Sequence, residues 1–409
     1  MKPAAPPPGE STMKRTIAVL LSLLMTLSAC AGPAGSAGTQ GAQSASTGAS
    51  AETAAAEEPA GNEKPELVIM GQEASNYSRA AESKKSIDVD VKTSALYSAH
   101  DIPKLSDKNY TVMIYVVGSN LESHYGAATN DLNEMIASGL DYDKNNLLVY
   151  TGGCKRWTSD ISNKHNSVIN LANGEELEVT AQTAETADMG ASQTLAEFVN
   201  YCTTNFPAKH YGLVLWNHGA GPLWGYGSDE LFDNDSLLFE ELRGAMDQTI
   251  FAGGTKLDWV GFDACLMGSI ETANLWKDYA QYLIGSEELE SGRGWDYSFL
   301  STLNTTDDAR TVVSSIVKAY GNYYEANKSD FFNPDVTLAA MDLSKTDALI
   351  GSMSALFGAM KKGVEEGDYA DINKARAKTK AFGLSAASSK DEAYDLLDLR
   401  NLTENMEKL

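Results

Sequence analysis

Cysteine, histidine and basic residues are all scarce in this sequence of 409 residues. It contains four cysteines, five histidines, and 32 Lys and Arg against 56 Asp and Glu, a net charge of −24. Four cysteines are too few for a fold held together by disulfides. The shortage of positive charge disfavours nucleic acid as a partner and electrostatic binding to anionic lipid, since both depend on clustered Lys and Arg. Because 43% of the residues are hydrophobic, we still expect a well-packed, acidic globular protein.

Several catalytic motifs are also missing. The sequence has no His-Glu-x-x-His, no Cys-x-x-Cys and no Gly-x-Ser-x-Gly, which disfavours zinc hydrolases and serine hydrolases. The short segment Gly219-Ala220-Gly221 lacks the third glycine of a dinucleotide-binding loop. Any chemistry must therefore come from another set of side chains.

Long hydrophobic runs are absent, but a short one lies near the N-terminus. After Met13 come two basic residues, an apolar run over 17–27, and the tetrapeptide Leu27-Ser28-Ala29-Cys30. This order is typical of a secretory signal peptide, and the run is too short to span a bilayer. The tetrapeptide resembles a bacterial lipobox, which implies cleavage before Cys30 and a lipid on its sulfur. We expect residues 1–29 to be a signal peptide, starting at Met13, and the protein to be anchored outside the cell through Cys30.

The next segments predict little stable structure. Residues 30–62 are mostly Ala, Gly, Ser and Thr, a composition that buries too little apolar surface to offset conformational entropy, so we expect a flexible tether. Residues 63–108 are polar and mixed, which predicts a partly ordered lead-in. The folded region is expected over 109–409. Because the chain stops inside an apparent helix, we also expect it to be a piece of a longer protein.

From Tyr110 onward, apolar runs alternate with segments of helical periodicity. The runs cover 110–118, 146–152, 211–216 and 257–262, and two further runs flanking Asn173-Gly174 predict a hairpin. Runs without polar alternation are typical of parallel strands buried on both faces. The pattern predicts an α/β fold with a mostly parallel central sheet and helices on both faces.

Two reactive side chains follow neighbouring runs. His218 comes just after the third run and Cys265 just after the fourth, so adjacent parallel strands would bring them to one rim of the sheet. A thiolate is a strong nucleophile, an imidazole can act as its base, and the backbone N–H groups of Gly219 and Cys265 are candidates for binding an oxyanion. Taken singly, such a histidine is more often structural and such a cysteine a small core residue. Their pairing at two strand ends favours catalysis.

The segments Tyr211–Gly219 and Leu257–Gly268, taken together, resemble the clostripain family of cysteine peptidases, which belongs to the caspase-like clan. Supporting matches are Tyr115–Glu122, and Ser286–Glu288 with Gly294-Trp295. The resemblance implies a caspase-like fold and peptide-bond hydrolysis through an acyl-enzyme. It places His218 and Cys265 in the catalytic dyad, and no cofactor is required for that chemistry. A surface-binding lipoprotein without turnover and a transpeptidase with the same dyad are the alternatives.

The resemblance also implies cleavage after Arg or Lys through an acidic pocket. Asp263 matches one acidic position, and the segment Glu287–Trp295 is where another contributor is expected. Its candidate substrate-binding residues are Glu287, Glu288, Glu290, Arg293 and Trp295. Arg293 departs from the family pattern. If it points into the pocket it opposes a basic substrate side chain, and if it faces solvent it does not.

The remaining candidates have simpler interpretations. An acidic loop contains Asp229, Glu230, Asp233 and Asp235, and it is either a calcium site, as in some relatives, or a solvated loop. Cys154 and Cys202 lack a nearby base and are predicted to have no part in catalysis. The expected partners are a peptide or protein substrate and the membrane, reached through Cys30.

Overall fold

The computed structural model describes residues 89–91, 106–171, 177–330, 336–383 and 396–409. The predicted signal peptide, Cys30, the tether, most of the lead-in and the turn at Asn173-Gly174 lie outside these residues. Within the described ranges, no helix is both long enough and apolar enough to cross a membrane.

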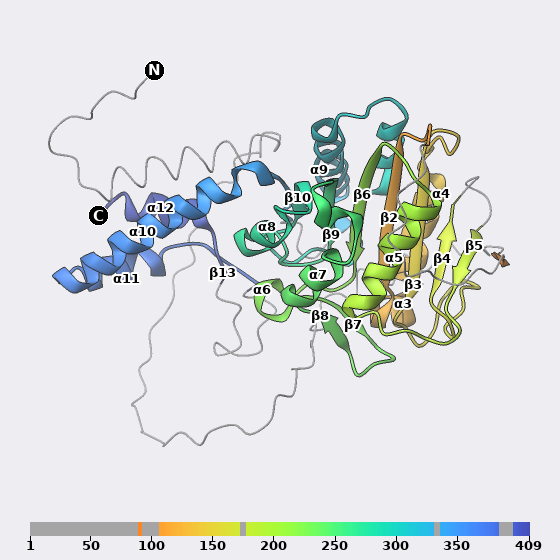
Figure 1. The fold of residues 1–409 in the computed structure, drawn as a ribbon. Helices are drawn as coiled ribbons and strands as arrows, with labels where there is room; N and C mark the ends of the chain where they lie inside the picture. Colours follow the sequence, from red (N-terminus) through yellow and green to blue (C-terminus); the bar gives the residue numbers. More distant parts are fainter. Residues whose placement is uncertain (1–88, 92–105, 172–176, 331–335, 384–395) are drawn as a thin grey trace, which may run out of the picture.

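A nine-stranded sheet forms the centre of the molecule (Figure 1). In spatial order its strands are β1 (Val89–Val91), β5 (Leu177–Gln182), β4 (Ser167–Asn170), β3 (Asn146–Gly152), β2 (Tyr110–Val117), β6 (His210–Trp216), β9 (Leu257–Asp263), β10 (Ala280–Gly285) and β11 (Ala339–Asp342). Strands β3, β2, β6, β9 and β10 run parallel, whereas β4 and β11 are antiparallel to their neighbours. The mostly parallel sheet is confirmed, and the predicted hairpin is present as the antiparallel pair β4–β5.

Both faces of the sheet are covered, because side chains of the buried strands alternate between two cores. In β2, Val112, Ile114 and Val116 face one core, while Met113 and Tyr115 face the other. The first core includes side chains of α4 (Ala127–Ala137), η3 (Tyr297–Asn304) and α9 (Ala309–Ala326). The second includes side chains of α5 (Ser192–Asn205), α7 (Phe239–Met246) and α8 (Ile270–Trp276). An unbroken apolar strand thus contributes buried side chains to both cores.

Several helices begin where the sequence provides a cap. The side chains of Ser269, Asp308 and Asp398 accept backbone N–H groups in the first turns of α8, α9 and α12 (Leu399–Met406). Such caps satisfy N–H groups that have no partner inside the helix.

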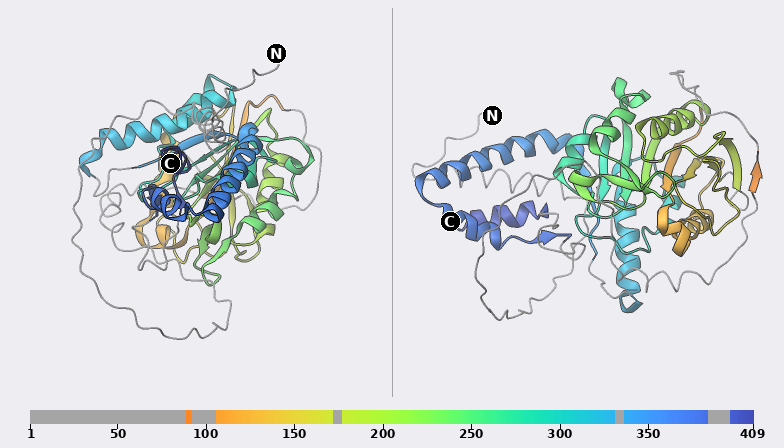
Figure 2. Two further views of the ribbon diagram at one scale, coloured as in Figure 1. Left: turned by 90° about the vertical axis from the view of Figure 1, so that its left-hand side faces the viewer. Right: turned by 90° about the horizontal axis from the view of Figure 1, so that it is seen from below.

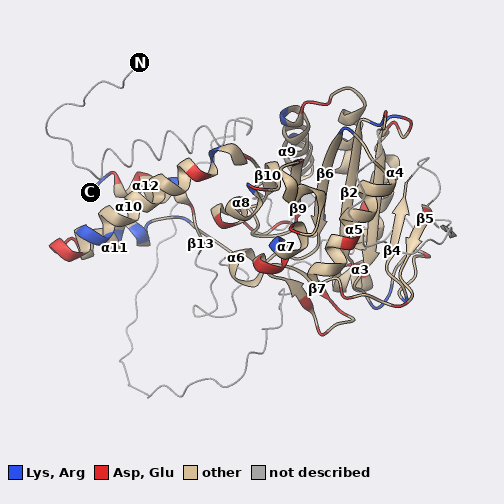
Figure 3. Ribbon diagram, in the orientation of Figure 1, with Lys and Arg blue, Asp and Glu red and all other residues tan. Residues whose placement is uncertain are grey.

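The C-terminal helices extend away from the sheet (Figure 2). They are α10 (Thr346–Glu366), α11 (Tyr369–Ala377) and α12, and they accompany a short strand pair, β12 (Ala381–Phe382) and β13 (Leu396–Leu397). Leu356, Ile372 and Met406 belong to a small core of their own. Figure 3 marks positions of Lys and Arg and of Asp and Glu along α10 and α11. The buried residues of these helices include Leu349, Leu356 and Ile372, whereas Lys361, Lys362 and Glu365 are exposed.

Short elements complete the described fold. They are α3 (Ser119–Tyr125), α6 (Gly221–Trp224), the hairpin of β7 (Tyr226–Asp229) and β8 (Asp235–Leu237), η2 (Ile250–Gly253), η4 (Lys328–Asp330) and η5 (Leu343–Lys345).

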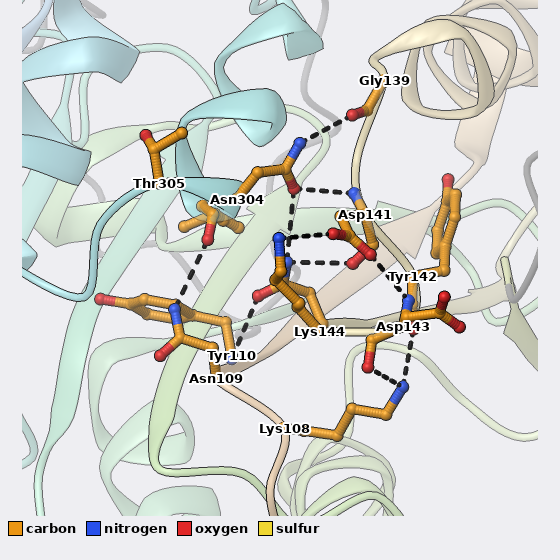
Figure 4. A network of polar contacts seen from close by, with 12 residues as sticks. Lys108, Asn109, Tyr110, Gly139, Asp141, Tyr142, Asp143, Lys144, Asn304 and Thr305 are labelled. Carbon is orange, nitrogen blue, oxygen red and sulfur yellow. Dashed lines mark hydrogen bonds and ion pairs between the residues drawn. The ribbon is translucent and has the colours of Figure 1, made fainter.

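Polar contacts hold the amino-terminal end of the sheet (Figure 4). Lys108 Nζ donates to the carbonyl oxygen of Asp143 at 2.9 Å. Asn304 Oδ1 accepts the Asp141 N–H at 2.7 Å, and its Nδ2 donates to the Gly139 carbonyl at 2.8 Å. The loop after α4 and the end of η3 are thereby fixed beside the start of β2. The carboxyl ends of the strands lie at the opposite rim.

Candidate active site

Strands β6 and β9 are adjacent and parallel, so they end at the same rim of the sheet. Trp216, the last residue of β6, pairs with Asp263, the last residue of β9. His218 and Cys265 each follow two residues later. The strand adjacency predicted from the sequence is confirmed.

A single cavity at this rim contains both predicted catalytic side chains. Its lining consists of Leu121, Trp216, Asn217, His218, Asp263, Ala264, Cys265, Glu290, Ser291, Gly292 and Gly294. His218 is 6% exposed and Cys265 is 9% exposed. The imidazole and the thiol are therefore largely shielded from solvent while bordering the same cavity.

The environment of His218 keeps its imidazole uncharged. Burial lowers the pKa of His218 to about 3, so the ring is neutral at neutral pH. Its Nε2 atom lies 2.7 Å from Oδ1 of Asn120. Sequence reasoning assigned no role to Asn120, although it follows the end of β2 much as His218 follows the end of β6.

Cys265 lies in a tight backbone arrangement. Its Sγ accepts the Glu290 N–H at 3.2 Å, and the next residue, Leu266, has a φ of 61°, which is unfavourable for a side chain with a Cβ. A Cβ on Gly219 would lie only 2.0 Å from the Cys265 carbonyl oxygen, so glycine is needed there. The backbones of Gly219 and Cys265, both predicted to bind an oxyanion, are thus in close contact.

Two buried carboxyl groups line the cavity beside the thiol. Asp263 is 4% exposed, and its Oδ2 accepts the Trp295 N–H at 3.2 Å and the Tyr297 hydroxyl at 2.9 Å. Burial raises the pKa of Asp263 to about 7. Glu290 is 7% exposed, and its carboxyl group lies beside the Asp263 carboxyl group and the Trp295 side chain. Burial, and then the charge of Asp263, raise the pKa of Glu290. Two adjacent buried carboxyl groups are costly to ionise together unless a cation lies near them.

Comparison with known proteins agrees with this geometry. Residues 114–409 match the model of the clostripain family. The chain belongs to the clostripain family. Clostripain from Hathewaya histolytica is 26% identical over 243 residues, which make up 50% of this chain and 45% of that protein, so the chain spans about half of its length. The solved structure of iotapain, a secreted C11 cysteine protease from Bacteroides thetaiotaomicron, is 18% identical with a TM-score of 0.51 and covers 74% of this chain and 84% of that chain. The caspase-like α/β fold is confirmed.

In this clostripain family member, Arg293 is not part of the cavity lining. Its guanidinium forms ion pairs with Asp131, at 3.3 Å, and with Glu134, both on α4. It also lies over the Tyr323 ring of α9, 5.0 Å from the centroid. Neither alternative inferred from the sequence describes this position: the side chain is 20% exposed and is held between two helices.

Asp131 is a member of the site that sequence reasoning missed. It is 3% exposed, accepts the Trp216 Nε1–H at 2.6 Å and pairs with Arg293. Burial, and then the charge of Asp263, raise the pKa of Asp131. It lies on α4, which mixes polar and apolar residues, so nothing local distinguishes it from a surface residue. Its contacts come from Trp216 on β6 and from Arg293, both of which are distant from it in the sequence.

Replacing Arg293 by methionine should destabilise the protein because Asp131 would lose its cationic partner. Breaking a buried ion pair from one side costs about 3 kcal/mol. Urea unfolding should show a loss of about this size for Arg293→Met, with partial recovery in Arg293→Met/Asp131→Asn. The exposed Arg310 on α9 provides a matched control, Arg310→Met, which should unfold like the parent. Equal midpoints for Arg293→Met and the control would contradict the expected structural role.

Three further substrate-binding candidates of this family member also lie outside the cavity lining. Glu287 is exposed, and the charged side chains near it are those of Asp398 and Lys380. Glu288 accepts the Gly383 N–H through Oε1 at 2.9 Å, so it faces strand β12. Trp295 is buried at 1% exposure and contributes its backbone N–H to Asp263. From the predicted segment, only Glu290 brings a charged side chain to the cavity.

The acidic loop that relatives suggested as a calcium site forms the β7–β8 hairpin. Both carboxyl oxygens of Asp229 accept backbone N–H groups, from Met189 and from Leu231, each at 2.8 Å. Across the described residues, no group of three or more His, Cys, Asp or Glu side chains is arranged to hold a metal ion. A calcium requirement therefore stays a prediction. Cys154 and Cys202 are buried and, like Cys265, form no disulfide.

Proposed function

We propose that this protein is a cysteine endopeptidase that uses His218 and Cys265 to hydrolyse peptide bonds. The observation that carries the proposal is the single cavity that both side chains line, together with two buried carboxyl groups. Membership of the clostripain family supports the same activity.

The reaction begins with transfer of the Cys265 proton to the neutral imidazole of His218. The thiolate attacks the carbonyl carbon of the scissile bond, and the resulting oxyanion receives hydrogen bonds from the N–H groups of Gly219 and Cys265. The imidazolium then protonates the departing amine, which leaves an acyl-enzyme thioester. Water, deprotonated by His218, attacks the thioester, and the released thiolate takes back the proton. The carboxylic acid product leaves, and both side chains return to their starting states.

The preferred bond follows Lys or Arg. Asp263 and Glu290 border the cavity beside the thiol, and Asp131 lies behind Asp263. Arg293 pairs with Asp131 and Glu134 from the α4 side, which leaves Asp263 and Glu290 as the carboxyl groups that line the cavity. A substrate ammonium or guanidinium would favour ionisation of the adjacent Asp263 and Glu290 carboxyl groups and form charge-assisted hydrogen bonds with them.

A peptide-library digest of the purified full-length protein tests this function. We expect cleavage predominantly after Lys and Arg, analysed by mass spectrometry with and without added calcium. Addition of a free amine nucleophile separates hydrolysis from transpeptidation, because a transpeptidase would yield mainly the amide product. No cleavage of any library peptide under either calcium condition would overturn the peptidase assignment.

We also propose that the protein acts outside the cell, anchored through a lipid on Cys30. The support is the lipobox-like sequence before Cys30 and the secreted character of the similar C11 protease from Bacteroides thetaiotaomicron. Metabolic labelling with an alkyne fatty acid should mark the native protein but not Cys30→Ser. Equal labelling of both would exclude Cys30 as the site.

A further inference from the structure

A third polar side chain reaches the candidate active site from a third neighbouring strand. Strand β2 lies on the other side of β6 from β9, with Val116 paired to Trp216. Gly118 and Ser119 follow the end of β2 and lead to Asn120. The Oδ1 atom of Asn120 lies 2.7 Å from Nε2 of His218. The imidazole therefore has one ring nitrogen engaged by a fixed protein group.

The neighbouring hydrogen bonds determine which end of the Asn120 amide faces the ring. The chain of contacts starts at Asn217, whose Nδ2 lies 2.5 Å from the Val117 carbonyl oxygen and must donate, because a carbonyl can only accept. The same Nδ2 donates to Ser119 Oγ at 2.8 Å, and the Leu121 N–H also donates to this hydroxyl oxygen at 3.3 Å.

Ser119 Oγ accepts both of these hydrogen bonds, so its two lone pairs are used and its hydroxyl proton must be donated elsewhere. Asn120 Oδ1 lies 3.2 Å from Ser119 Oγ and receives it. The Asn120 amide therefore has its oxygen, not its nitrogen, directed toward Ser119 Oγ and His218 Nε2. An amide oxygen can only accept a hydrogen bond. A contact of 2.7 Å between that oxygen and His218 Nε2 then requires a hydrogen on Nε2.

We propose that Asn120 is a positioning residue that fixes His218 as the Nε2–H tautomer, leaving the lone pair on Nδ1 as the base for Cys265. The inference rests on the proposed function for the direction of proton transfer. Since the imidazole is neutral, exactly one ring nitrogen carries a proton, and an acceptor at Nε2 decides which. Without Asn120 the Nδ1–H tautomer, which cannot deprotonate the thiol from that nitrogen, becomes populated.

The backbone around Ser119 supports this assignment. Ser119 is 1% exposed and has a φ of 48°, in the left-handed region that is unfavourable for serine. Its N–H donates to the Gly153 carbonyl at 3.0 Å, which holds the turn between β2 and α3. Such strain persists where the surrounding structure enforces it, and it is concentrated at functional sites. Here it directs two consecutive side chains, Ser119 and Asn120, toward β6.

Peptide hydrolysis by Asn120→Ala and Asn120→Asp tests the proposal. We expect kcat of Asn120→Ala to fall roughly 10- to 100-fold with KM within twofold, a loss like that seen when the hydrogen-bond partners that orient metal-ligating histidines are removed. Asn120→Asp retains an acceptor oxygen and should lose much less. The matched control is Asn200→Ala, which removes an amide that donates to the Gln248 carbonyl at the protein surface and should leave kcat unchanged. Equal losses in Asn120→Ala and Asn120→Asp, or a loss confined to KM, would overturn the proposal.

The tautomer itself can be observed without any substrate. Nitrogen NMR of the full-length protein with ¹⁵N-labelled histidine, assigned against His218→Gln, should show Nε2 protonated and Nδ1 unprotonated at neutral pH. In Asn120→Ala the two nitrogen shifts should move toward a tautomer mixture. A protonated Nδ1 in the native protein, or unchanged shifts in Asn120→Ala, would refute the role of Asn120. Because this measurement needs no turnover, it separates failure of this proposal from failure of the proposed peptidase function.

Discussion

Replacing Cys265 by alanine should abolish peptide cleavage, with kcat/KM reduced about 10⁴-fold or more. The substitution removes the sulfur that forms the acyl-enzyme, and loss of a covalent nucleophile has an effect of this order. His218→Ala should have a comparable effect, because the thiol then lacks a base. The double variant should be little worse than either single one, since the two residues act as a unit. Turnover of a peptide with Lys or Arg before the scissile bond measures all three.

Cys202→Ala provides the control for the loss of a buried thiol. Cys202 lies on α5 within the second core, remote from the rim, and like Cys265 it forms no disulfide. This variant should retain cleavage. Substantial activity in Cys265→Ala or His218→Ala would show that the dyad has been assigned to the wrong residues.

Asp263→Asn should lower kcat/KM for substrates with Lys or Arg before the scissile bond by about 10²- to 10³-fold. Removing one member of a desolvated charge pair costs 2–5 kcal/mol, which corresponds to a loss of this size. Glu290→Gln should reduce the same quantity, because Glu290 is the second carboxyl group that lines the cavity. Peptides with norleucine or citrulline at that position should be much less affected. Parallel losses for charged and neutral peptides would instead indicate damage to the dyad.

Affinity for a cationic ligand should also depend on pH through Asp263. Its pKa is about 7, so the carboxyl group is mostly protonated at pH 6 and mostly ionised at pH 8. Attraction for a guanidinium therefore increases as the pH rises through 7. The inhibition constant of a simple alkylguanidine should accordingly decrease between pH 6 and pH 8. Because it reports binding alone, this constant does not depend on the proton transfers of catalysis. A flat profile in the native protein would contradict the assignment of Asp263 to the cation site, and Asp263→Asn should flatten it.

The central sheet could be predicted well from the sequence. The runs at Tyr110–Gly118 and Leu257–Phe262 are mostly apolar, as strands buried on both faces require, and this pattern is local. Because parallel strands end at a common rim, the position of one reactive residue after each strand was enough to predict that His218 and Cys265 meet. The short helix α3 was not predicted, and neither was the role of the two residues that begin it.

The charged residues of the segment Glu287–Trp295 could not be placed in this way. Glu287, Glu288, Glu290 and Arg293 look equivalent in a loop without periodicity, yet one borders the cavity and the others do not. The direction of Arg293 is set by Asp131 and Glu134 on α4, more than 150 residues earlier, and by Tyr323 on α9. The loop sequence contains no information about these partners.

The sequence by itself determined the strands, their burial on two faces, and the positions of His218, Cys265 and Asp263 at strand ends, because these depend on local periodicity and on the geometry of parallel sheets. Only the tertiary structure decided that Asn120 contacts His218, that Glu290 enters the cavity and that Arg293 pairs with α4. Each of these depends on the direction of a side chain, which is fixed by packing and charge partners that lie far apart in the chain.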